Sequence, residues 1–226
     1  MPGYERSAHL YDIFDTKQNI DFFLSFASPG DEILDVGAGT GRIAIPAARN
    51  GIRVWCVEPS PAMRGVLLSK IESEPDLRDR IEIVPATASS FRIERTFPVA
   101  ILSGCFDHFL DDAERTSSLS NIAHHLKEGG KLIMDVYFAL KGGSGLHPAG
   151  DFTIGGKRYR RFVERREIGN DMLSVHLIFE IYGEGNLLER IEEESLVGRC
   201  TRASVHRLLE KTGFEVTGEF GDYERA

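Results

Sequence analysis

The chain contains 226 residues, 42% of them hydrophobic, and has a formal net charge of −8. This length suits a single α/β domain with one embellishment, and the negative charge argues against nucleic acid as the main partner. Its three cysteines are scattered, without the spacing of a metal site or a disulfide framework, and no secretory signal or membrane-spanning apolar run is evident, so we expect a cytoplasmic protein with no bound metal.

The first core element is an apolar run, Ile33 to Val36, that ends in the alternate glycines Gly37, Gly39 and Gly41. The run predicts a buried parallel strand, and the glycines predict a tight turn that a ligand can approach without obstruction by Cβ atoms. Helix-like sequence follows from Arg42 to Arg49, so the turn is expected to deliver backbone N–H groups at a helix start. Ligands bind at that place in open α/β sheets.

The spacing of this turn separates two classes of nucleotide site. Arg42 stands where a dinucleotide fingerprint has its third glycine, and no Lys-Ser/Thr pair completes a phosphate-binding loop. A carboxylate at Asp35 would repel a pyrophosphate but suits a cationic amino-acid ligand. The pattern resembles motif I of the class I S-adenosylmethionine-dependent methyltransferases. The resemblance implies cofactor contacts from Asp35, Gly37, Ala38, Gly39 and Gly41.

Ile52 to Glu58 predicts a second strand that ends in an acid, about twenty residues past the glycines. A carboxylate at this spacing meets ribose hydroxyls, although this feature alone would fit NAD equally well. Ser60 and Pro61 suit the N-cap and first position of the next helix. In the methyltransferases, the methionine of this segment flanks the adenine, while a core Met63 is the alternative. The resemblance therefore adds Glu58, Pro59 and Met63 as cofactor contacts.

Two further strands follow the family pattern with two departures, at Thr87 and at Pro98. Arg80 to Ala88 predicts the third strand and its exit loop, and Val99 to Ser103 predicts the fourth. Family members usually place an aspartate where Thr87 stands, so the Thr87 hydroxyl or the backbone near Ala88 is expected to meet the adenine. Ser103, at the end of the fourth strand, completes the expected cofactor contacts.

A helix from Asp112 to Leu126 and a turn at Lys127 to Gly130 precede the fifth strand. Strands and helices thus alternate from Ile33 to Asp135, which predicts a parallel sheet with right-handed crossovers. We expect one domain over 1–226 with a Rossmann-like, doubly wound, mostly parallel α/β sheet and helices on both faces. Its cofactor-binding core spans 31–140.

Residues 141–200 are expected to form an antiparallel insertion. A glycine-rich loop, Lys141 to Gly150, leads into three predicted strands: Tyr159 to Ile168, Leu173 to Tyr182, and Leu188 to Val197. The middle strand has one apolar face, formed by Val175, Leu177, Phe179 and Ile181. The basic cluster Lys157 to Arg161 is interpreted as a solvated strand face, with RNA binding as the alternative. Resemblance to the sugar-amine and glycine N-methyltransferases implies that this insertion roofs the acceptor pocket, and it offers a contact for a homodimer.

Residues 201–226 predict a helix, Thr201 to Lys211, and a sixth strand, Phe214 to Phe220. The family usually adds a seventh, antiparallel strand, which we expect to be missing here unless Glu189 to Val197 or another segment takes its place; a clipped chain and a shortened sheet both fit. At the other end, residues 1–30 are expected to hold a helix, Ser7 to Phe14. In many small-molecule methyltransferases a Tyr-Asp pair such as Tyr11-Asp12 belongs to a lid that contacts the cofactor, whereas simple packing on the sheet is the alternative.

Together these features predict transfer of a methyl group from S-adenosylmethionine to a small-molecule acceptor by in-line displacement, without nucleic acid or membrane partners. An amine is favoured, because an amine that enters neutral needs no dedicated base. Candidate catalytic residues are His108, Tyr137 and Tyr11. A binding-only or regulatory protein that keeps the fold is the alternative, favoured by Thr87 and the missing strand.

Overall fold

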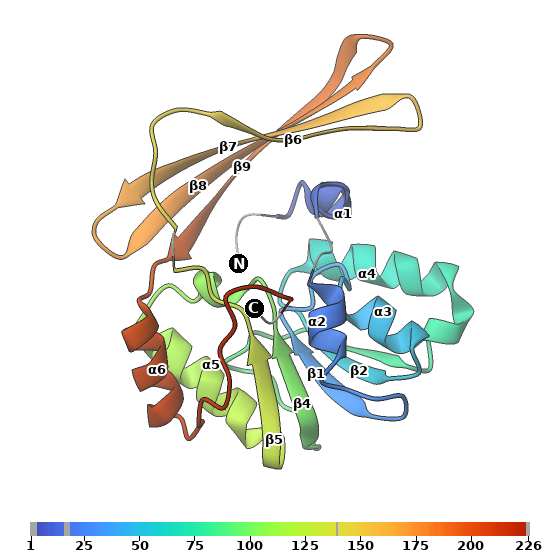
Figure 1. Cartoon of the computed structure of the whole chain (residues 1–226). Coiled ribbons are helices and arrows are strands. Elements are labelled where there is room, and N and C mark those ends of the chain that lie inside the picture. Colours follow the sequence, from blue (N-terminus) through green and yellow to red (C-terminus); the bar gives the residue numbers. More distant parts are fainter. Residues whose placement is uncertain (1–3, 16–18, 139, 225–226) are drawn as a thin grey trace.

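The computed structural model describes residues 4–15, 19–138 and 140–224, and two sheets organise this part of the chain (Figure 1). The central sheet has five parallel strands in the order β3-β2-β1-β4-β5. These strands are β1 (Glu32–Val36), β2 (Arg53–Val57), β3 (Ile81–Val84), β4 (Phe97–Leu102) and β5 (Leu126–Met134). The predicted fold class is therefore confirmed.

Helices cover both faces of the parallel sheet, because successive β1 side chains point to opposite sides. Ile33 belongs to a core shared with α2, α3 and α4, while Leu34 belongs to a second core shared with α5 and α6. The helices are α1 (Tyr11–Phe14), α2 (Ile20–Leu24), α3 (Ala44–Arg49), α4 (Pro61–Ser73), α5 (Asp112–His124) and α6 (Arg202–Lys211). Short 3₁₀ turns stand at η1 (Ala8–Leu10), η2 (Pro75–Leu77) and η3 (Phe106–His108).

The strand order reverses between β1, which is the central strand, and its neighbour β4. Since all five strands are parallel, their carboxyl ends lie at one edge of the sheet. The connections after β1 and β4 leave this edge toward helices on opposite faces of the sheet, α3 and α5. Open α/β sheets bind ligands at this position. The turn predicted at Lys127 to Gly130 is instead a bulge within β5, which pairs Leu126 with Phe97 and Lys131 with Val99.

The insertion is a four-stranded antiparallel sheet, one strand more than predicted. Its strands are β6 (His147–Ile154), β7 (Lys157–Ile168), β8 (Met172–Gly183) and β9 (Asn186–Gly198). The missed strand, β6, contains Pro148 and Gly150, residues that usually mark a loop. Both are tolerated because β6 is an edge strand, paired only with β7 through a register shift between these two residues.

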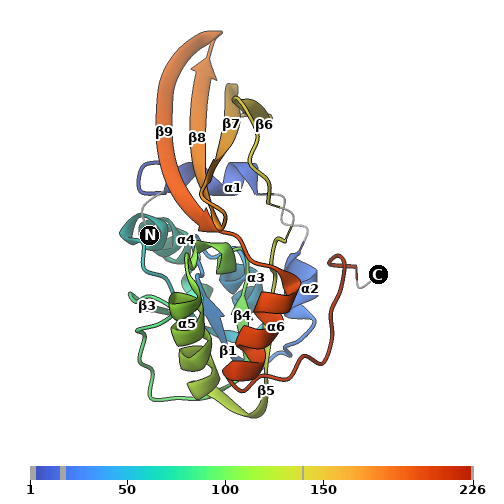
Figure 2. The same ribbon diagram turned by 90° about the vertical axis from the view of Figure 1, so that its left-hand side faces the viewer.

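The apolar face of β8 packs against the N-terminal helical segment, as its alternation predicts. Leu177, Phe179 and Ile181 form one core with Leu10 and Phe14. Figures 1 and 2 show α1 between the antiparallel sheet and the carboxyl edge of the parallel sheet. The N-terminal segment therefore joins the two sheets.

The prediction of a sixth strand from Phe214 to Phe220 is wrong, since residues 214–220 have no strand structure. Glu219 instead pairs with Arg202 of α6, and the rings of Phe220 and Tyr223 lie edge-on to Phe22 of α2, each with centroids 5.7 Å apart. Side-chain contacts with two helices thus hold this segment in place of a backbone ladder. Predicted helix 201–211 is confirmed as α6, with Thr201 and Ser204 forming a capping box.

Candidate functional site

The glycine turn after β1 lies against the loop after β4, at the point where the strand order reverses. The Cys105 thiol donates a hydrogen bond to the Val36 carbonyl at 3.3 Å. A Cβ atom on Gly37 would lie 2.7 Å from the Cys105 sulfur, so only glycine permits this contact. The turn and the β4 loop therefore form one continuous wall of the candidate site.

The three glycines of the turn are required for different reasons. All have positive φ, +75° at Gly37, +57° at Gly39 and +88° at Gly41. A Cβ atom on Gly41 would overlap Leu67 of α4, so Gly41, like Gly37, serves internal packing. A Cβ atom on Gly39 would meet nothing closer than the Gly37 carbonyl oxygen, 4.0 Å away. Gly39 is therefore the position where the turn leaves space for a ligand.

The backbone N–H groups of the turn are largely used inside the protein, contrary to the expectation that they face a ligand. Those of Gly37 and Ala38 donate to the Val57 carbonyl, at 2.8 and 3.2 Å, and that of Gly41 donates to the Ala38 carbonyl at 2.9 Å. Helix α3 begins only at Ala44. Most amides of the glycine turn are thus bonded within the protein and the helix starts beyond it, which agrees with the choice of a cationic ligand over a dinucleotide.

Glu58 connects β2 with the glycine turn and is 5% exposed. One carboxylate oxygen accepts the Gly39 N–H at 2.9 Å, and the other accepts the Ser60 N–H at 2.8 Å. Each oxygen has a second lone pair, so the carboxylate can still receive two hydroxyl donors. Burial raises the pKa of Glu58, and the two backbone hydrogen bonds oppose that rise. Ser60 caps α4 by accepting the Met63 N–H at 3.3 Å, as predicted.

Asp35 is the buried acid at the end of β1, only 2% exposed. Its Oδ2 atom has no hydrogen-bond partner among the residues that the structure describes. Burial raises the pKa of Asp35 from the ordinary 3.8 to about 7, with Arg42 opposing the shift. A buried carboxylate oxygen without a donor is stabilised by a cation. This acid and Glu58 therefore fit a cofactor that combines positive charge with a ribose.

Replacing Asp35 by asparagine should stabilise the ligand-free protein at alkaline pH. Unfolded Asp35 loses its proton near 3.8 and folded Asp35 near 7. The contribution of Asp35 to the free energy of unfolding is therefore greatest below pH 3.8. It falls as the pH rises from 3.8 to about 7, and it changes no further above pH 7. The gain in unfolding free energy from Asp35→Asn should grow by roughly 2–3 kcal/mol between pH 5 and pH 8. Urea denaturation at both pH values measures it, and a gain independent of pH would contradict the assignment.

A polar network links the glycine turn to the ends of β4 and β5. Arg42 hydrogen bonds to Asn19 and donates to the Ser103 hydroxyl at 2.7 Å. Ser103 donates in turn to Asp135 Oδ2 at 3.1 Å, and the Gly104 N–H donates to Asp135 Oδ1 at 2.6 Å. Ser103 is thus a structural link in this network, and its predicted contact with the cofactor stays a prediction.

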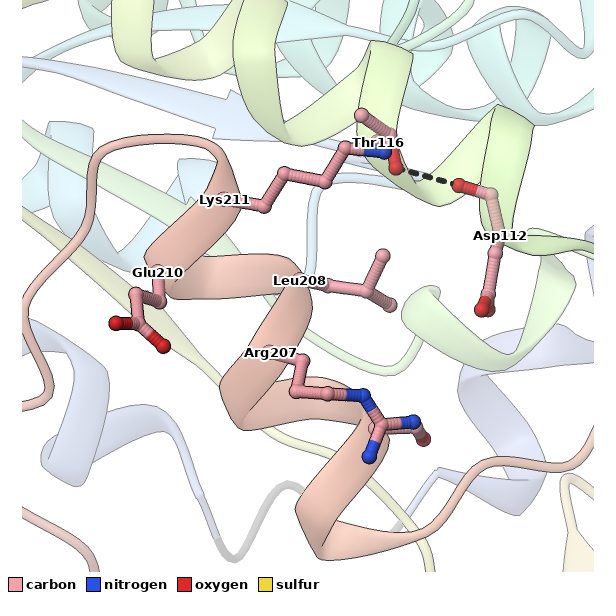
Figure 3. A pocket seen from close by; sticks show the side chains of 7 residues that line it. Asp112, Thr116, Arg207, Leu208, Glu210 and Lys211 are labelled. Atoms are coloured by element: carbon pink, nitrogen blue, oxygen red, sulfur yellow. Dashed lines mark hydrogen bonds between the residues drawn. The ribbon is translucent and has the colours of Figure 1, made fainter.

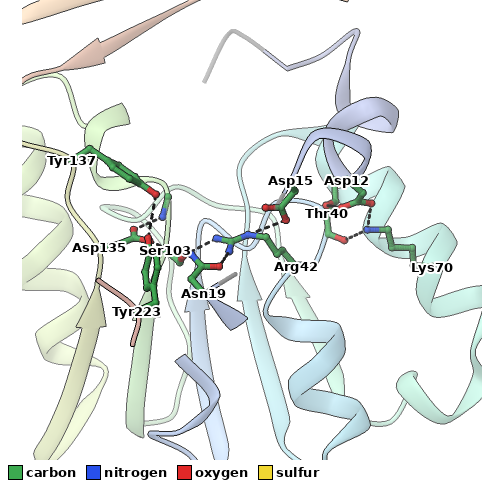
Figure 4. Close-up of polar contacts among 11 residues, drawn as sticks. Asp12, Asp15, Asn19, Thr40, Arg42, Lys70, Ser103, Asp135, Tyr137 and Tyr223 are labelled. Carbon is green, nitrogen blue, oxygen red and sulfur yellow. Dashed lines mark hydrogen bonds and ion pairs between the residues drawn. The ribbon is translucent and has the colours of Figure 1, made fainter. Parts of the chain in front are cut away.

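A cavity of 230 Å³ opens beside this network (Figure 4). It brings together the N-terminal segment, the glycine turn, the β4 loop and the C-terminal segment. Two sequence candidates, Tyr11 and Tyr137, form part of its wall. The lining residues are Tyr11, Asp15, Asn19, Arg42, Gly104, Tyr137 and Tyr223. Sequence reasoning missed Asn19 and Tyr223, which no motif marks, and noted Arg42 only as a mismatch to the dinucleotide fingerprint.

His108 is not among the residues that line this cavity. It ends η3, and its ring lies edge-on to Tyr4, which lies edge-on to Tyr11, both with centroids 5.9 Å apart. Burial lowers the pKa of His108, so its neutral form is favoured. The three catalytic candidates are thus divided between the cavity and an adjoining aromatic group.

The residues predicted to meet the adenine stand along the ends of β2 and β3. Met63 and Ala88 are buried, while Thr87 is exposed, with its hydroxyl 2.7 Å from that of Ser90. The Pro59 carbonyl accepts a hydrogen bond from Arg64 at 2.7 Å. The contacts of Met63, Thr87 and Ala88 with adenine, and that of Pro59 with the cofactor, remain predictions.

An ion pair holds the N-terminal helix above the glycine turn. Asp12 of α1 accepts a hydrogen bond from the Thr40 hydroxyl at 2.7 Å and pairs with Lys70 of α4. Lys70 also donates to the Thr40 carbonyl at 2.8 Å. These contacts hold α1 against the glycine turn, and its role as a lid over the cofactor stays a prediction.

A second cavity, of 460 Å³, lies between α5 and α6 (Figure 3). It shares no lining residue with the glycine turn or the 230 Å³ cavity. Its lining residues are Asp112, Thr116, Ser204, Arg207, Leu208, Glu210 and Lys211. None of the sequence candidates lies there, so we assign the site to the carboxyl edge of the parallel sheet.

Comparison with known proteins agrees with this site. Residues 33–130 match the family model described as a methyltransferase domain. An uncharacterised methyltransferase of Bacillus cereus (strain ATCC 10987 / NRS 248) is 25% identical over 181 residues, which cover 75% of this chain and 78% of that protein.

Solved methyltransferases share the overall fold. An S-adenosylmethionine-dependent methyltransferase of Clostridium acetobutylicum ATCC 824 superposes with a TM-score of 0.77 at 20% identity, covering 97% of this chain and 91% of that one. The sugar N-methyltransferase KedS8 of Streptoalloteichus sp. ATCC 53650 gives 0.72 at 19% identity, covering 90% and 83%. Among the residues described in this structure, no helix has the length and apolar character needed to cross a membrane.

Proposed function

This chain carries a methyltransferase domain of the class I S-adenosylmethionine-dependent family, and from that premise we propose that it methylates the nitrogen of a small-molecule amine. The acceptor enters the 230 Å³ cavity, and the cofactor lies along the glycine turn between Asp35 and Glu58. When bound, S-adenosylmethionine supplies a methyl carbon activated by a sulfonium and leaves as a neutral thioether.

The observation that carries the amine assignment is the excess of acid around the cavity. Asp15 is one of its lining residues, Asp135 accepts hydrogen bonds from two others, and Asp107 accepts one from the Tyr137 backbone. Arg42 is the single cation among the lining residues. Burial and the neighbouring Asp135 raise the pKa of Asp107 to about 6. Such surroundings disfavour an anionic acceptor and suit an amine, which enters neutral and becomes positively charged as it is methylated.

The chain's own residues supply position rather than acid–base chemistry in this proposal. Glu58 accepts ribose hydroxyls, Asp35 offsets the positive charge of the cofactor, and Gly39 leaves the space for it. Tyr137 orients the acceptor nitrogen, while Tyr11 and the helix it belongs to limit access of water. The solved neighbour KedS8, a sugar N-methyltransferase, supports the choice of an amine.

Two measurements test this function. Calorimetric titration should show binding of S-adenosylmethionine and none of NAD, and the opposite result would contradict the cofactor assignment. A labelled-methyl assay over panels of amines, phenols and carboxylates should label amines. Binding of the cofactor without transfer to any panel would favour a binding-only protein.

A further inference from the structure

The C-terminal segment carries Tyr223 into the wall of the 230 Å³ cavity. The Tyr223 ring packs against Phe22 and Phe23 of α2, with centroids 5.7 and 6.2 Å apart. Its hydroxyl donates to Asp135 Oδ2 at 2.9 Å and lies 3.2 Å from the Tyr137 hydroxyl (Figure 4). Tyr223 thus connects a partly buried carboxylate with a tyrosine that lines the cavity.

The hydrogen atoms of this chain of contacts can point in only one direction. An ionised carboxylate is an acceptor only, so Asp135 receives the Gly104 N–H, the Ser103 hydroxyl and the Tyr223 hydroxyl. A hydroxyl has one hydrogen, and Tyr223 uses its hydrogen on Asp135. In the contact between the two tyrosines, Tyr137 must therefore donate and Tyr223 accept. The Tyr137 oxygen then has lone pairs, and no hydrogen, to offer the cavity.

Neighbouring groups support this direction. Arg42, the cation of the cavity wall, is engaged with Asn19, Ser103 and Asp15, so each of its three nitrogens already has a partner. Burial, together with Tyr137 and Asp135, raises the pKa of the Tyr223 hydroxyl well above its usual range, which keeps its hydrogen in place. Tyr137 is 48% exposed and lines the cavity.

We propose that Tyr223 is a positioning residue that sets the Tyr137 hydroxyl as a hydrogen-bond acceptor, so that the cavity selects an acceptor nitrogen bearing at least one N–H. This inference rests on the proposed function. It narrows the acceptor to primary and secondary amines that enter in the neutral form. Groups that offer only lone pairs, such as carboxylates and neutral tertiary amines, find no donor at Tyr137.

The test compares two cofactor analogues in wild-type protein and in Tyr223→Phe. Sinefungin carries an amine where S-adenosylmethionine carries its methylated sulfonium, whereas S-adenosylhomocysteine has neither the methyl nor an amine there. Tyr223→Phe keeps the ring on Phe22 and Phe23 but removes the hydroxyl. We expect unchanged affinity for S-adenosylhomocysteine and an affinity for sinefungin lowered by about fivefold, since the Tyr137 oxygen remains but is no longer held by Tyr223 with its lone pairs toward the amine.

A matched control and a second variant complete the calorimetric experiment. Tyr182→Phe removes a hydroxyl that donates to Glu180 on β8, outside the cavity, and should leave both affinities unchanged. Asp135→Asn introduces an amide donor that allows the tyrosine contact to reverse, and should lower sinefungin affinity as Tyr223→Phe does. The proposal would be overturned if Tyr223→Phe left both affinities unchanged, or if it lowered both by the same factor. Failure of wild-type protein to bind either analogue would instead refute the proposed function.

Discussion

Replacing Gly39 by alanine is expected to weaken S-adenosylmethionine binding by roughly 5- to 150-fold, the effect of overpacking worth 1–3 kcal/mol. A Cβ atom at this position enters open space in the ligand-free protein, with no atom nearer than 4.0 Å. The substitution therefore places a methyl group where the proposed cofactor lies, and the protein itself offers no clash. Calorimetric titration of the purified variant measures the loss.

Two glycine variants separate this effect from backbone strain. Gly155 lies in the β6–β7 turn at a φ of +58°, close to the +57° of Gly39, and also has open space around its Cβ position. Gly155→Ala should lower the free energy of unfolding by about as much as Gly39→Ala does, but it should bind the cofactor with unchanged affinity. Gly41→Ala should instead destabilise the fold, because its Cβ overlaps Leu67. Normal cofactor affinity in Gly39→Ala would refute the proposed position of the ligand.

Replacing Glu58 by alanine should weaken the cofactor by roughly 10- to 150-fold, corresponding to the loss of charge-assisted hydrogen bonds worth 1.5–3 kcal/mol. The variant loses the acceptor for the ribose hydroxyls. It also leaves the N–H groups of Gly39 and Ser60 without their partner, so the turn that shapes the site loses an anchor. Titration calorimetry and thermal unfolding distinguish the loss of affinity from a loss of stability.

Glu82→Ala is the matched control, because Glu82 is an exposed glutamate on β3, next to β2. It should leave cofactor affinity unchanged. Glu58→Gln keeps one oxygen acceptor and should lie between wild-type protein and the alanine variant. If Glu58→Ala bound the cofactor as tightly as Glu82→Ala does, the ribose assignment of Glu58 would be refuted.

Local patterns predicted the parallel sheet well. The apolar runs around Ile33, Val54 and Ile101 are confirmed as β1, β2 and β4, since a strand buried on both faces is apolar at nearly every position. The glycine spacing predicted the turn, and the acid at the end of β2 predicted its partner. The hydrogen bond from Gly39 to Glu58 brings these two motifs into direct contact.

The errors fall where local signals compete with long-range contacts. Pro148 and Gly150 indicated a loop, but pairing with β7 makes this segment an edge strand. Phe214 to Phe220 has strand-like composition, but the contacts of Phe220 with α2 and of Glu219 with α6 determine its path. Composition does not reveal whether a strand will find a partner.

The sequence by itself determined the nucleotide-binding half of this protein: the strand ends, the glycine turn, and the acids Asp35 and Glu58 that suit a cationic cofactor. Periodicity and the positive φ of glycine are local properties, so they can be recognised without the fold. Only the tertiary structure decided which residues form the 230 Å³ cavity that we propose for the acceptor, and which hydroxyls meet there. Tyr137 and Tyr223 are 86 residues apart, and Asp135 and Tyr223 are 88 apart. Hydrogen-bond direction depends on partners that meet only once the chain has folded.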